Sequence, residues 1–311
     1  MPVLNLSRLR ILYELNRSGT LAEVARVLSY TPSAISQQLS QLEREAGVPL
    51  LEKVGRRVRL TDEALTLVKH TQVILEQLEL AEAELSAAQP EIHGTLRVAS
   101  FQTVLLSILP VALSVLAQKH PGMDVEITQR EVGPAYEGLL AHEFDLILGE
   151  EYPGQPEPIR SGIDREDFTR DALRLALPGE GPHSVRPVRL SDLSEMSWAL
   201  DPHNSPARRW ADALCRRSGF EAKVRFESPD PLLHAHLVRL GHAAAFIPSL
   251  VGAAHLEGAQ LVSLPGDPHR TLFTAVRSGR SKHRLVEAFR QALAEAARAN
   301  PVLSPVMELS A

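Results

Sequence analysis

The chain has 311 residues, of which 44% are hydrophobic and 23% charged, and its formal net charge is −5. At about 100–200 residues per domain, this composition indicates two or three folded domains and excludes a disordered or disulfide-stapled chain. The opening residues lack the apolar core of a signal peptide, and no run of about 18 apolar residues occurs, so we expect neither secretion nor a membrane span. A single cysteine, Cys215, and no zinc-type Cys/His spacing favour a reducing, cytoplasmic setting without a structural metal.

Charge is distributed unevenly along the chain. Residues 1–60 contain nine Lys or Arg against five Glu, whereas residues 61–90 contain one Lys against six acidic residues. The remaining residues are mildly acidic. The N-terminal module is therefore basic and the rest of the chain is acidic, so we expect phosphate contacts in this module.

The basic module begins with helical patterns. An apolar stripe at helical spacing ends near Gly19, and Thr20 with Glu23 forms a capping box that predicts a second, short helix. Thr31 followed by Pro32 predicts the N-cap and the first residue of a third helix. Two helices joined by so short a turn must cross at a steep angle, which predicts a helix-turn-helix.

The third predicted helix has two distinct faces. Ile35, Leu39, Leu42 and Ala46 share an apolar stripe, and small hydroxyl and amide side chains occupy the other side. A helix that only needs solubility usually carries Glu and Lys, whereas Ser and Gln hydrogen-bond base edges and phosphates. The alternative is an ordinary polar surface helix. The residues predicted to contact DNA from this helix are Thr31, Pro32, Ser33, Ser36, Gln37, Ser40 and Arg44.

After a helix-ending glycine, residues 48–60 predict a hairpin that turns at Gly55. Arg56, Arg57 and Arg59 lie at or near its tip. Three arginines within four residues form a wing that can follow a phosphate backbone or enter the minor groove. These three arginines join the predicted DNA contacts.

The order of these residues resembles the LysR-type transcriptional regulators. The matching runs are 19–25, 28–39, 42–43, 47–52 and 55–61. The resemblance implies an N-terminal winged helix-turn-helix, a long dimerising linker helix and a C-terminal effector-binding domain. The chain departs from the common pattern in its third helix, where members often have Arg after the second Ser and again one turn later, and this chain has Gln37-Gln38 and Ser40-Gln41. This departure shifts the expected phosphate binding to Arg44 and the wing.

A long helix is predicted from its N-cap Thr61 to Pro90, because neither Gly nor Pro interrupts the segment. A seven-residue repeat places Ala64, Thr71, Leu78 and Leu85 at one core position and Leu67, Ile74, Ala81 and Ala88 at the other. So narrow an apolar seam favours a partner helix, and hence a homodimer or homotetramer; the alternative is packing against the chain's own domain. The predicted domains are 1–61 for DNA binding, 62–90 for the linker helix and 91–311 for effector binding.

From about residue 91, strand patterns alternate with helical ones, which predicts an α/β domain with a mostly parallel sheet. The strand patterns cover 95–99, 124–128, 144–148, 173–177, 197–200, 223–226, 244–247, 260–264 and 272–276, and a last helix covers about 282–299. The arrangement resembles the family's effector domain, which is similar to periplasmic binding proteins and encloses a ligand cleft between two lobes. The resemblance implies lobe one at about 91–167 plus 268–301 and lobe two at about 168–267.

Ligands of open α/β sheets bind beyond the carboxyl ends of strands, often at helix N-termini that attract anions. Two segments meet this description, one after the first strand of the domain and one after the strand that contains Trp198. The predicted effector-binding residues are Ser100, Gln102, Thr103, Thr128, His203, Asn204 and Ser205. The alternative is that these residues only cap helices. The two helix starts favour a small organic acid as the effector.

Two further signals are assigned no function. Cys215 shares a helix face with apolar residues, so it is expected in a core. His234 and His236 resemble a metal-binding pair, but residues two apart on a helix do not face each other. No metal is assigned to them.

The sequence therefore predicts a sequence-specific, DNA-binding transcriptional regulator whose activity is modulated by a small-molecule effector bound between two α/β lobes. Its expected partners are double-stranded promoter or operator DNA, further copies of the chain and RNA polymerase, and no cofactor is expected besides the effector. An enzyme with a DNA-binding head is disfavoured, because the sequence has no phosphate-cradling glycine loop, nucleophile elbow or metal-binding helix motif. A solute-binding transport protein is also disfavoured, because such a function does not explain the first 90 residues.

Overall fold

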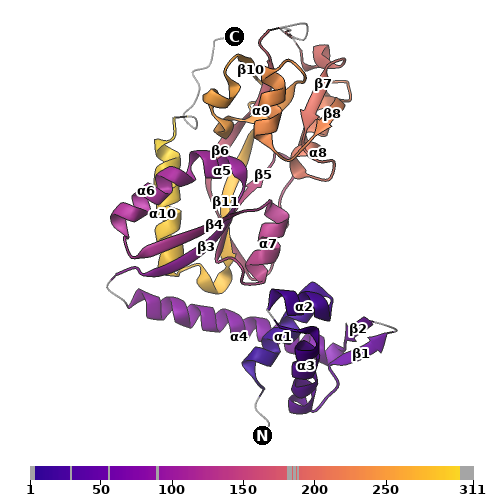
Figure 1. The fold of residues 1–311 in the computed structure, drawn as a ribbon, viewed down its shortest axis with the longest axis vertical. Coiled ribbons are helices and arrows are strands. Elements are labelled where there is room, and N and C mark those ends of the chain that lie inside the picture. Colours follow the sequence, from indigo (N-terminus) through magenta and orange to yellow (C-terminus); the bar gives the residue numbers. More distant parts are fainter. Residues whose placement is uncertain are drawn as a thin grey trace.

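The computed structural model describes residues 4–28, 30–54, 57–88, 91–180, 184, 187 and 189–301. Figure 1 shows a small helical module at the lower end of the molecule, a long helix α4 beside it, and an upright α/β domain above them. Within the described residues, no helix is both long and apolar enough to cross a lipid bilayer.

The N-terminal module, here called the head module, contains three helices and a hairpin. They are α1 (Leu6–Ser18), α2 (Leu21–Val27), α3 (Pro32–Ala46), β1 (Leu51–Val54) and β2 (Arg57–Leu60). The hydroxyl of Thr20 accepts a hydrogen bond from the amide of Glu23, and Thr31 caps α3 in the same way. The capping box predicted for α2 is only half formed, because the Glu23 carboxylate pairs with Arg26 instead. Apolar side chains from all three helices meet in one core.

The hairpin is held against the third helix. β1 and β2 pair in antiparallel register, with Leu51 opposite Leu60. One carboxylate oxygen of Glu43 on α3 accepts hydrogen bonds from the amides of Leu50 and Leu51, at 2.9 and 3.1 Å. The position of the hairpin therefore follows that of α3. The predicted turn residue, Gly55, lies outside the described residues.

Helix α4 (Asp62–Ala87) packs against both domains. Ala64 near its start lies in the core of the head module. Toward its other end Glu79 is buried, and its carboxylate accepts a hydrogen bond of 2.5 Å from Nε of Arg277 in the C-terminal domain. The head module also contacts this domain directly, since Arg17 donates a hydrogen bond to the backbone oxygen of Glu137. These contacts seat α4 and the head module on the C-terminal domain of the same chain.

The predicted heptad seam of α4 lies in two environments. Ala64 and Thr71 are buried within their own chain, so the expectation that they face a partner helix is wrong. The first turns of α4 instead close the core of the head module. Ile74, Leu78 and Leu85 are exposed, at 42%, 42% and 71% of their full areas. Only the middle and last turns of α4 therefore offer an apolar seam to a second molecule.

The C-terminal domain consists of two α/β lobes and two strands that join them. Lobe one contains β3 (Gly94–Ser100), α5 (Gln102–Ser107), α6 (Leu109–Lys119), β4 (Met123–Gln129), α7 (Val132–Leu140), β5 (Leu146–Glu151), η4 (Ser278–Arg280) and α10 (Arg284–Ala299). The segment of lobe two contains η1 (Leu190–Leu193), β7 (Ser197–Leu200), α8 (Pro206–Arg217), β8 (Lys223–Glu227), α9 (Pro231–Arg239), β9 (Ala245–Pro248), η2 (Ser249–Val251), η3 (Ala253–Leu256) and β10 (Ala259–Ser263). The joining strands β6 (Ile163–Pro178) and β11 (His269–Arg277) run through the centre of the domain in Figure 1.

The sheets of this domain are mixed. β3 pairs in parallel with β4 and β5, and β7 pairs in parallel with β8. β11 is antiparallel to β5 and β6, and β6 is antiparallel to β9 and β10. The expectation of a mostly parallel sheet is therefore wrong, because the two joining strands run in opposite directions through its centre.

Each lobe has an apolar core between its sheet and its helices. Cys215 on α8 lies in the same buried cluster as Trp198 and Trp210, which confirms its expected place in a core. Burial raises the pKa of the Cys215 thiol to about 12. The thiol therefore stays protonated at neutral pH and acts as an apolar side chain.

Candidate functional site

The outward side of α3 carries small polar side chains. Ile35, Leu39 and Leu42 are buried in the head module, whereas every residue predicted to contact DNA from this helix is exposed. These exposed residues are Thr31, Pro32, Ser33, Ser36, Gln37, Ser40 and Arg44. The polar surface extends from the N-cap of the helix to its last turn.

Hydrogen bonds inside the head module distinguish the glutamines of α3. Gln38 accepts a hydrogen bond of 3.0 Å from Nε of Arg8, and Gln41 accepts one of 3.0 Å from Nε of Arg44. Gln37 has no hydrogen-bond partner among the residues that the structure describes. Its amide group is therefore free for a base edge, and a glutamine can pair with adenine through two hydrogen bonds.

The hairpin beside α3 carries positive charge. Arg59 on β2 forms an ion pair of 2.9 Å with Glu52 on β1, which neutralises part of its charge. Arg57 pairs with Val54 through the strand register, and Arg56 lies outside the described residues. An exposed helix with small polar side chains beside an arginine-bearing hairpin matches the chemistry of a helix that enters the major groove while a wing contacts phosphates.

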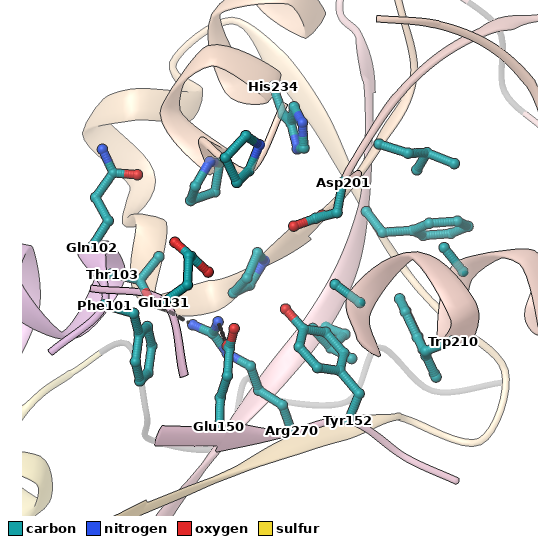
Figure 2. Close-up of a pocket in the computed structure, with 18 residues that line it drawn as sticks. Phe101, Gln102, Thr103, Glu131, Glu150, Tyr152, Asp201, Trp210, His234 and Arg270 are labelled. Atoms are coloured by element: carbon teal, nitrogen blue, oxygen red, sulfur yellow. Dashed lines mark hydrogen bonds and ion pairs between the residues drawn. The ribbon is translucent and has the colours of Figure 1, made fainter. Parts of the chain in front are cut away.

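A second candidate site is a pocket between the two lobes of the C-terminal domain. Figure 2 shows its lining, which comes from both lobes and from the joining strands. The polar lining includes Gln102, Glu131, Glu150, Asp201, His234 and Arg270. A concave site between lobes with a few converging polar groups is typical of small-molecule binding.

Lobe one places two of its predicted residues in this pocket. Gln102 and Thr103 line it, and the hydroxyl of Thr103 accepts a hydrogen bond of 2.7 Å from Arg270. Ser100 is fully buried at the end of β3 and does not line the pocket. Thr128 pairs with Ala99 inside the sheet and also lies outside the lining. Both residues therefore lie in the sheet outside this lining, and their assignment to the effector stays a prediction.

The predicted residues of lobe two lie outside the pocket lining. His203 and Asn204 are exposed in the turn before α8, and Ser205 caps this helix by accepting a hydrogen bond from the amide of Arg208. Asp201, which directly follows β7, is the residue of this turn that lines the pocket. The structure therefore brings Asp201 to the pocket and leaves these three residues outside its lining, and their assignment to the effector stays a prediction.

Arg270 is almost fully buried at the base of the pocket as drawn in Figure 2. Its Nε and Nη2 donate to one carboxylate oxygen of Asp171 at 2.9 and 2.6 Å, Nη2 also donates to Thr103, and Nη1 donates to Glu150. Asp171 in turn accepts a hydrogen bond of 3.1 Å from the amide of Leu250. This network ties β5 and α5 of lobe one to β6 and η2.

Three carboxylates, those of Glu131, Glu150 and Asp201, point into the same space in Figure 2. Burial, and then the charges of Glu150 and Glu131, raise the pKa of Asp201 to about 7. Burial also raises the pKa of Glu150, although Arg270 opposes the shift. Glu131 is more exposed, and its partial desolvation followed by the charge of Glu150 raises its pKa. Repulsion among these carboxylates therefore persists in the presence of one arginine.

His234 on α9 borders the pocket opposite Arg270 in Figure 2. It is 2% exposed, and its Nε2 has no hydrogen-bond partner in the structure. Burial lowers the pKa of His234, so its ring is neutral at pH 7, and one nitrogen of a neutral ring accepts a hydrogen bond. The rings of Tyr152 and Trp210, 6.0 Å apart, form an aromatic wall. In the described part of the chain, no three His, Cys, Asp or Glu side chains are arranged to hold a metal ion.

Most of this polar lining went unpredicted. Glu131, Glu150 and Asp201 each lie at, or within two residues of, the carboxyl end of a strand. Ligand-binding residues are expected at such ends, so the same rule applied to every strand would have found all three. Arg270 lies at the start of a strand and His234 within a helix, and neither position carries a local signal.

Two family models match the chain. The model described as "Bacterial regulatory helix-turn-helix protein, lysR family" matches residues 6–65, and the model described as "LysR substrate binding domain" matches residues 89–298. The chain belongs to the LysR family. The predictions of a LysR-type regulator, of a mixed α/β architecture with a helix-turn-helix head, and of a protein that is not an enzyme are thereby confirmed. This LysR-family protein is a DNA-binding transcriptional regulator with an effector-binding domain.

Curated relatives support this family. A "Probable RuBisCO transcriptional regulator" of Trichormus variabilis is 27% identical over 296 residues, which cover 92% of this chain and 86% of that protein. The "HTH-type transcriptional regulator ClcR" of Pseudomonas putida is 31% identical over 159 residues, which cover 51% of this chain and 54% of ClcR. Each of these relatives is named as a regulator of transcription.

Solved structures share the whole fold. A full-length OxyR variant from Pseudomonas aeruginosa, with a single substituted cysteine, superposes with a TM-score of 0.68 at 18% identity, covering 99% of both chains. Full-length CbnR complexed with its target DNA superposes with a TM-score of 0.52 at 22% identity, covering 93% of this chain and 99% of CbnR. The order of head module, linker helix and two-lobed domain in this LysR-family regulator is therefore that of full-length regulators.

Proposed function

We propose that this LysR-family regulator binds an operator as an oligomer built from dimers, reads the base sequence with α3, and changes its action when a small molecule occupies the pocket between its lobes. The observation that carries the proposal is the exposed polar face of α3, on which the amide of Gln37 has no partner among the described residues. An unpartnered amide on an exposed helix has the chemistry that base-edge recognition needs. The proposal includes the wing, where Arg57 and Arg59 add contacts to phosphates.

Dimerisation in the proposal uses the exposed half of the α4 seam. Ile74, Leu78 and Leu85 follow one another at heptad spacing, and all three side chains are exposed in the single chain. Burial of apolar side chains against the same helix of a second copy would remove this surface from water. Two head modules held in this way can contact two half-sites of an inverted repeat.

The proposal places the regulator in the cytoplasm, where promoter DNA and RNA polymerase are accessible to it. RNA polymerase is included as a partner because a regulator bound at a promoter acts on the polymerase that initiates transcription at that promoter. The effector is a small molecule, since the pocket between the lobes combines aromatic side chains with a few converging polar groups. No resident cofactor is proposed.

The test begins with selection of sheared genomic DNA on the purified full-length protein. Fluorescence anisotropy then compares an enriched fragment with a random duplex. We expect the enriched fragment to bind at least about 1000-fold more tightly than the random duplex. Failure to prefer any fragment, with and without metabolites, would overturn the proposed function.

Variants test whether α3 and the hairpin form the surface that contacts the bases and phosphates, here called the reading surface. Gln37→Ala is expected to weaken binding to the enriched fragment by about 5- to 150-fold, equivalent to about 1–3 kcal/mol, and to leave binding to random DNA unchanged. Gln118→Ala, at an exposed position on α6, removes the same side chain far from α3 and is the matched control. The paired variant Arg56→Ala/Arg57→Ala is expected to reduce the salt dependence of binding by about one phosphate contact per arginine. Unchanged affinity in both α3 and wing variants at several salt concentrations would refute this reading surface.

A further inference from the structure

The charges that line the inter-lobe pocket are predominantly negative. Glu131, Glu150 and Asp201 contribute three carboxylates, against the single guanidinium of Arg270. Neither Glu131 nor Asp201 has an ion-pair partner among the described residues. Two carboxylates therefore face the pocket without an ion-pair partner, and the charge of Glu150 makes their ionised forms more costly.

Arg270 is not available to an incoming anion. Its Nε and Nη2 both bond to Asp171, its Nη1 bonds to Glu150, and its Nη2 also bonds to Thr103. Asp171 is fully buried, so this part of the positive charge is used inside the protein. An anionic ligand would have to compete with two carboxylates already in contact with the guanidinium.

One of the two helix starts that suggested an anion site, that of α8, is also occupied. Ser205 caps α8, and its own side-chain oxygen accepts the hydrogen bond of the Arg208 amide. The amide of Arg209 bonds to the backbone oxygen of Ser205. The first turn of α8 therefore directs these amides to the chain itself, which removes the start of α8 as a basis for an organic acid.

His234 gives an independent indication that a hydrogen-bond donor belongs in the pocket. Its side chain is 2% exposed, it lines the pocket, and its Nε2 has no partner. The great majority of buried polar atoms are hydrogen-bonded, so an unpartnered ring nitrogen beside a pocket is available to a donor group of a ligand. Burial keeps the ring neutral, and a neutral ring offers an acceptor to an N–H group.

Much of the remaining lining is aromatic. Tyr152 and Trp210 stand 6.0 Å apart, and Phe246 packs edge-on against Trp210 with ring centroids 5.3 Å apart. All three line the pocket. Such walls bury a hydrocarbon skeleton, and aromatic faces also attract an organic cation.

We propose that the inter-lobe pocket binds a small organic ammonium compound, an amine with a hydrocarbon body, whose N–H groups reach Glu131, Asp201 and His234. This inference rests on the proposed function only in taking the pocket as the effector site. A bare divalent metal ion is a poorer occupant, because no three metal-ligating side chains among the described residues are arranged around one point. The amine would also relieve the repulsion that the carboxylates exert on one another.

Calorimetry on the full-length protein tests the inference with matched probes. One set is 2-phenylethylamine, 2-phenylethanol and 3-phenylpropionate, and the other is 1,4-diaminobutane, 1,4-butanediol and succinate. Within at least one set, the amine is expected to bind at least about tenfold more tightly than the alcohol, and the acid more weakly than both. Equal binding of amine and alcohol in both sets, tighter binding of an acid, or no binding of either amine would overturn the inference.

Variants assign the binding to the pocket. Asp201→Asn and Glu131→Gln are each expected to lower the affinity for the amine about tenfold and to leave the affinity for the alcohol unchanged. Asp124→Asn, an exposed acid on β4, makes the same charge change away from the pocket and is the control. Equal losses in Asp124→Asn and Asp201→Asn would mean that the amine responds only to net charge, which overturns the inference.

The two proposals fail in different ways. Operator affinity measured without any ligand tests the reading surface and is independent of the pocket. If an acid binds in the pocket and changes operator affinity, the proposed function stands and the amine inference fails. If the amine binds through Asp201 but leaves operator affinity and promoter activity unchanged, the amine inference stands and the effector role of the pocket fails.

Discussion

Replacing Arg270 by methionine tests whether the buried network below the pocket holds the effector domain together. The variant Arg270→Met retains an unbranched side chain of similar length and removes every N–H donor. Asp171, which is completely buried, then loses its cation and two hydrogen bonds, and Glu150 and Thr103 lose one each. The carboxylate of Asp171 retains only the amide of Leu250 as a partner.

The expected loss of stability follows from the buried charge left behind. Removing one partner of a buried ion pair costs about 3–5 kcal/mol. For a domain of this size, that cost lowers the melting temperature by roughly 6–20 °C. Urea unfolding and calorimetry of the full-length protein measure both quantities for the transition of the effector domain.

Two comparisons separate this explanation from a general loss of packing. The double variant Arg270→Met/Asp171→Asn removes the orphaned charge, so it is expected to be more stable than Arg270→Met by about 2 kcal/mol or more. Arg174→Met breaks an ion pair with Asp267, whose side chain is largely exposed, and should cost less than about 1 kcal/mol. The reasoning is refuted if Arg270→Met costs no more than Arg174→Met, or if the double variant is no more stable than the single one.

Three further predictions concern other parts of the molecule. Ile74→Glu/Leu78→Glu places charges on the exposed seam of α4 and is expected to convert the oligomer to monomers in sedimentation experiments; an unchanged oligomer would exclude this seam. The affinity for an amine should fall up to about tenfold per pH unit below pH 7 and level off above about pH 8, because the cation binds the ionised form of Asp201, whose pKa is about 7. Calorimetry should show this dependence vanish in Asp201→Asn, and a dependence that persists there would contradict the assignment. In Gly279→Ala the new Cβ would stand 2.6 Å from the backbone oxygen of Glu76, so hydrogen exchange in α4 should accelerate as the helix leaves the effector domain; unchanged exchange would show that the neighbours yield instead.

The head module was predictable because its signals are local. Thr31 and Pro32 set the start of α3, and Gly47, in the left-handed region at φ 73°, follows its last turn. The helix period then decides which side chains face the core, so the exposure of Gln37 followed from spacing alone. Interactions between residues distant in sequence lay beyond this reasoning. The pairing of Gln38 with Arg8, which leaves Gln37 as the unpartnered glutamine, is one of them.

The joining strand β6 shows where local patterns were insufficient. Only residues 173–177 read as a strand, whereas β6 begins at Ile163 and includes the charged run from Asp164 to Asp167. These charged residues have no apolar alternation, and they are extended because they pair with β11. Pairing with a strand distant in sequence therefore determines the structure of this segment. Local sequence patterns do not contain that information.

The sequence predicted the location of the pocket but not its charge. The rule that ligands bind beyond the carboxyl ends of strands correctly predicted that Gln102 and Thr103 line the pocket. On lobe two, the same rule selected residues such as Ser205, which caps a helix. Helix starts suggested an anion. The charge of the pocket is set instead by Asp201 and by the bonds that saturate Arg270, and those bonds exist only in the folded chain.

Strand β11 spans the distance between the two buried arginines of the effector domain. Arg270 near its beginning borders the pocket, and Arg277 at its end holds Glu79 of α4. At roughly 3.3 Å per residue, the two side chains are anchored about 23 Å apart on one extended backbone. Since β5 and β6 flank this backbone, its length is nearly fixed. The path from the pocket to the linker helix is thus a single strand, interrupted by a register irregularity between Leu272 and Phe273 and by no loop.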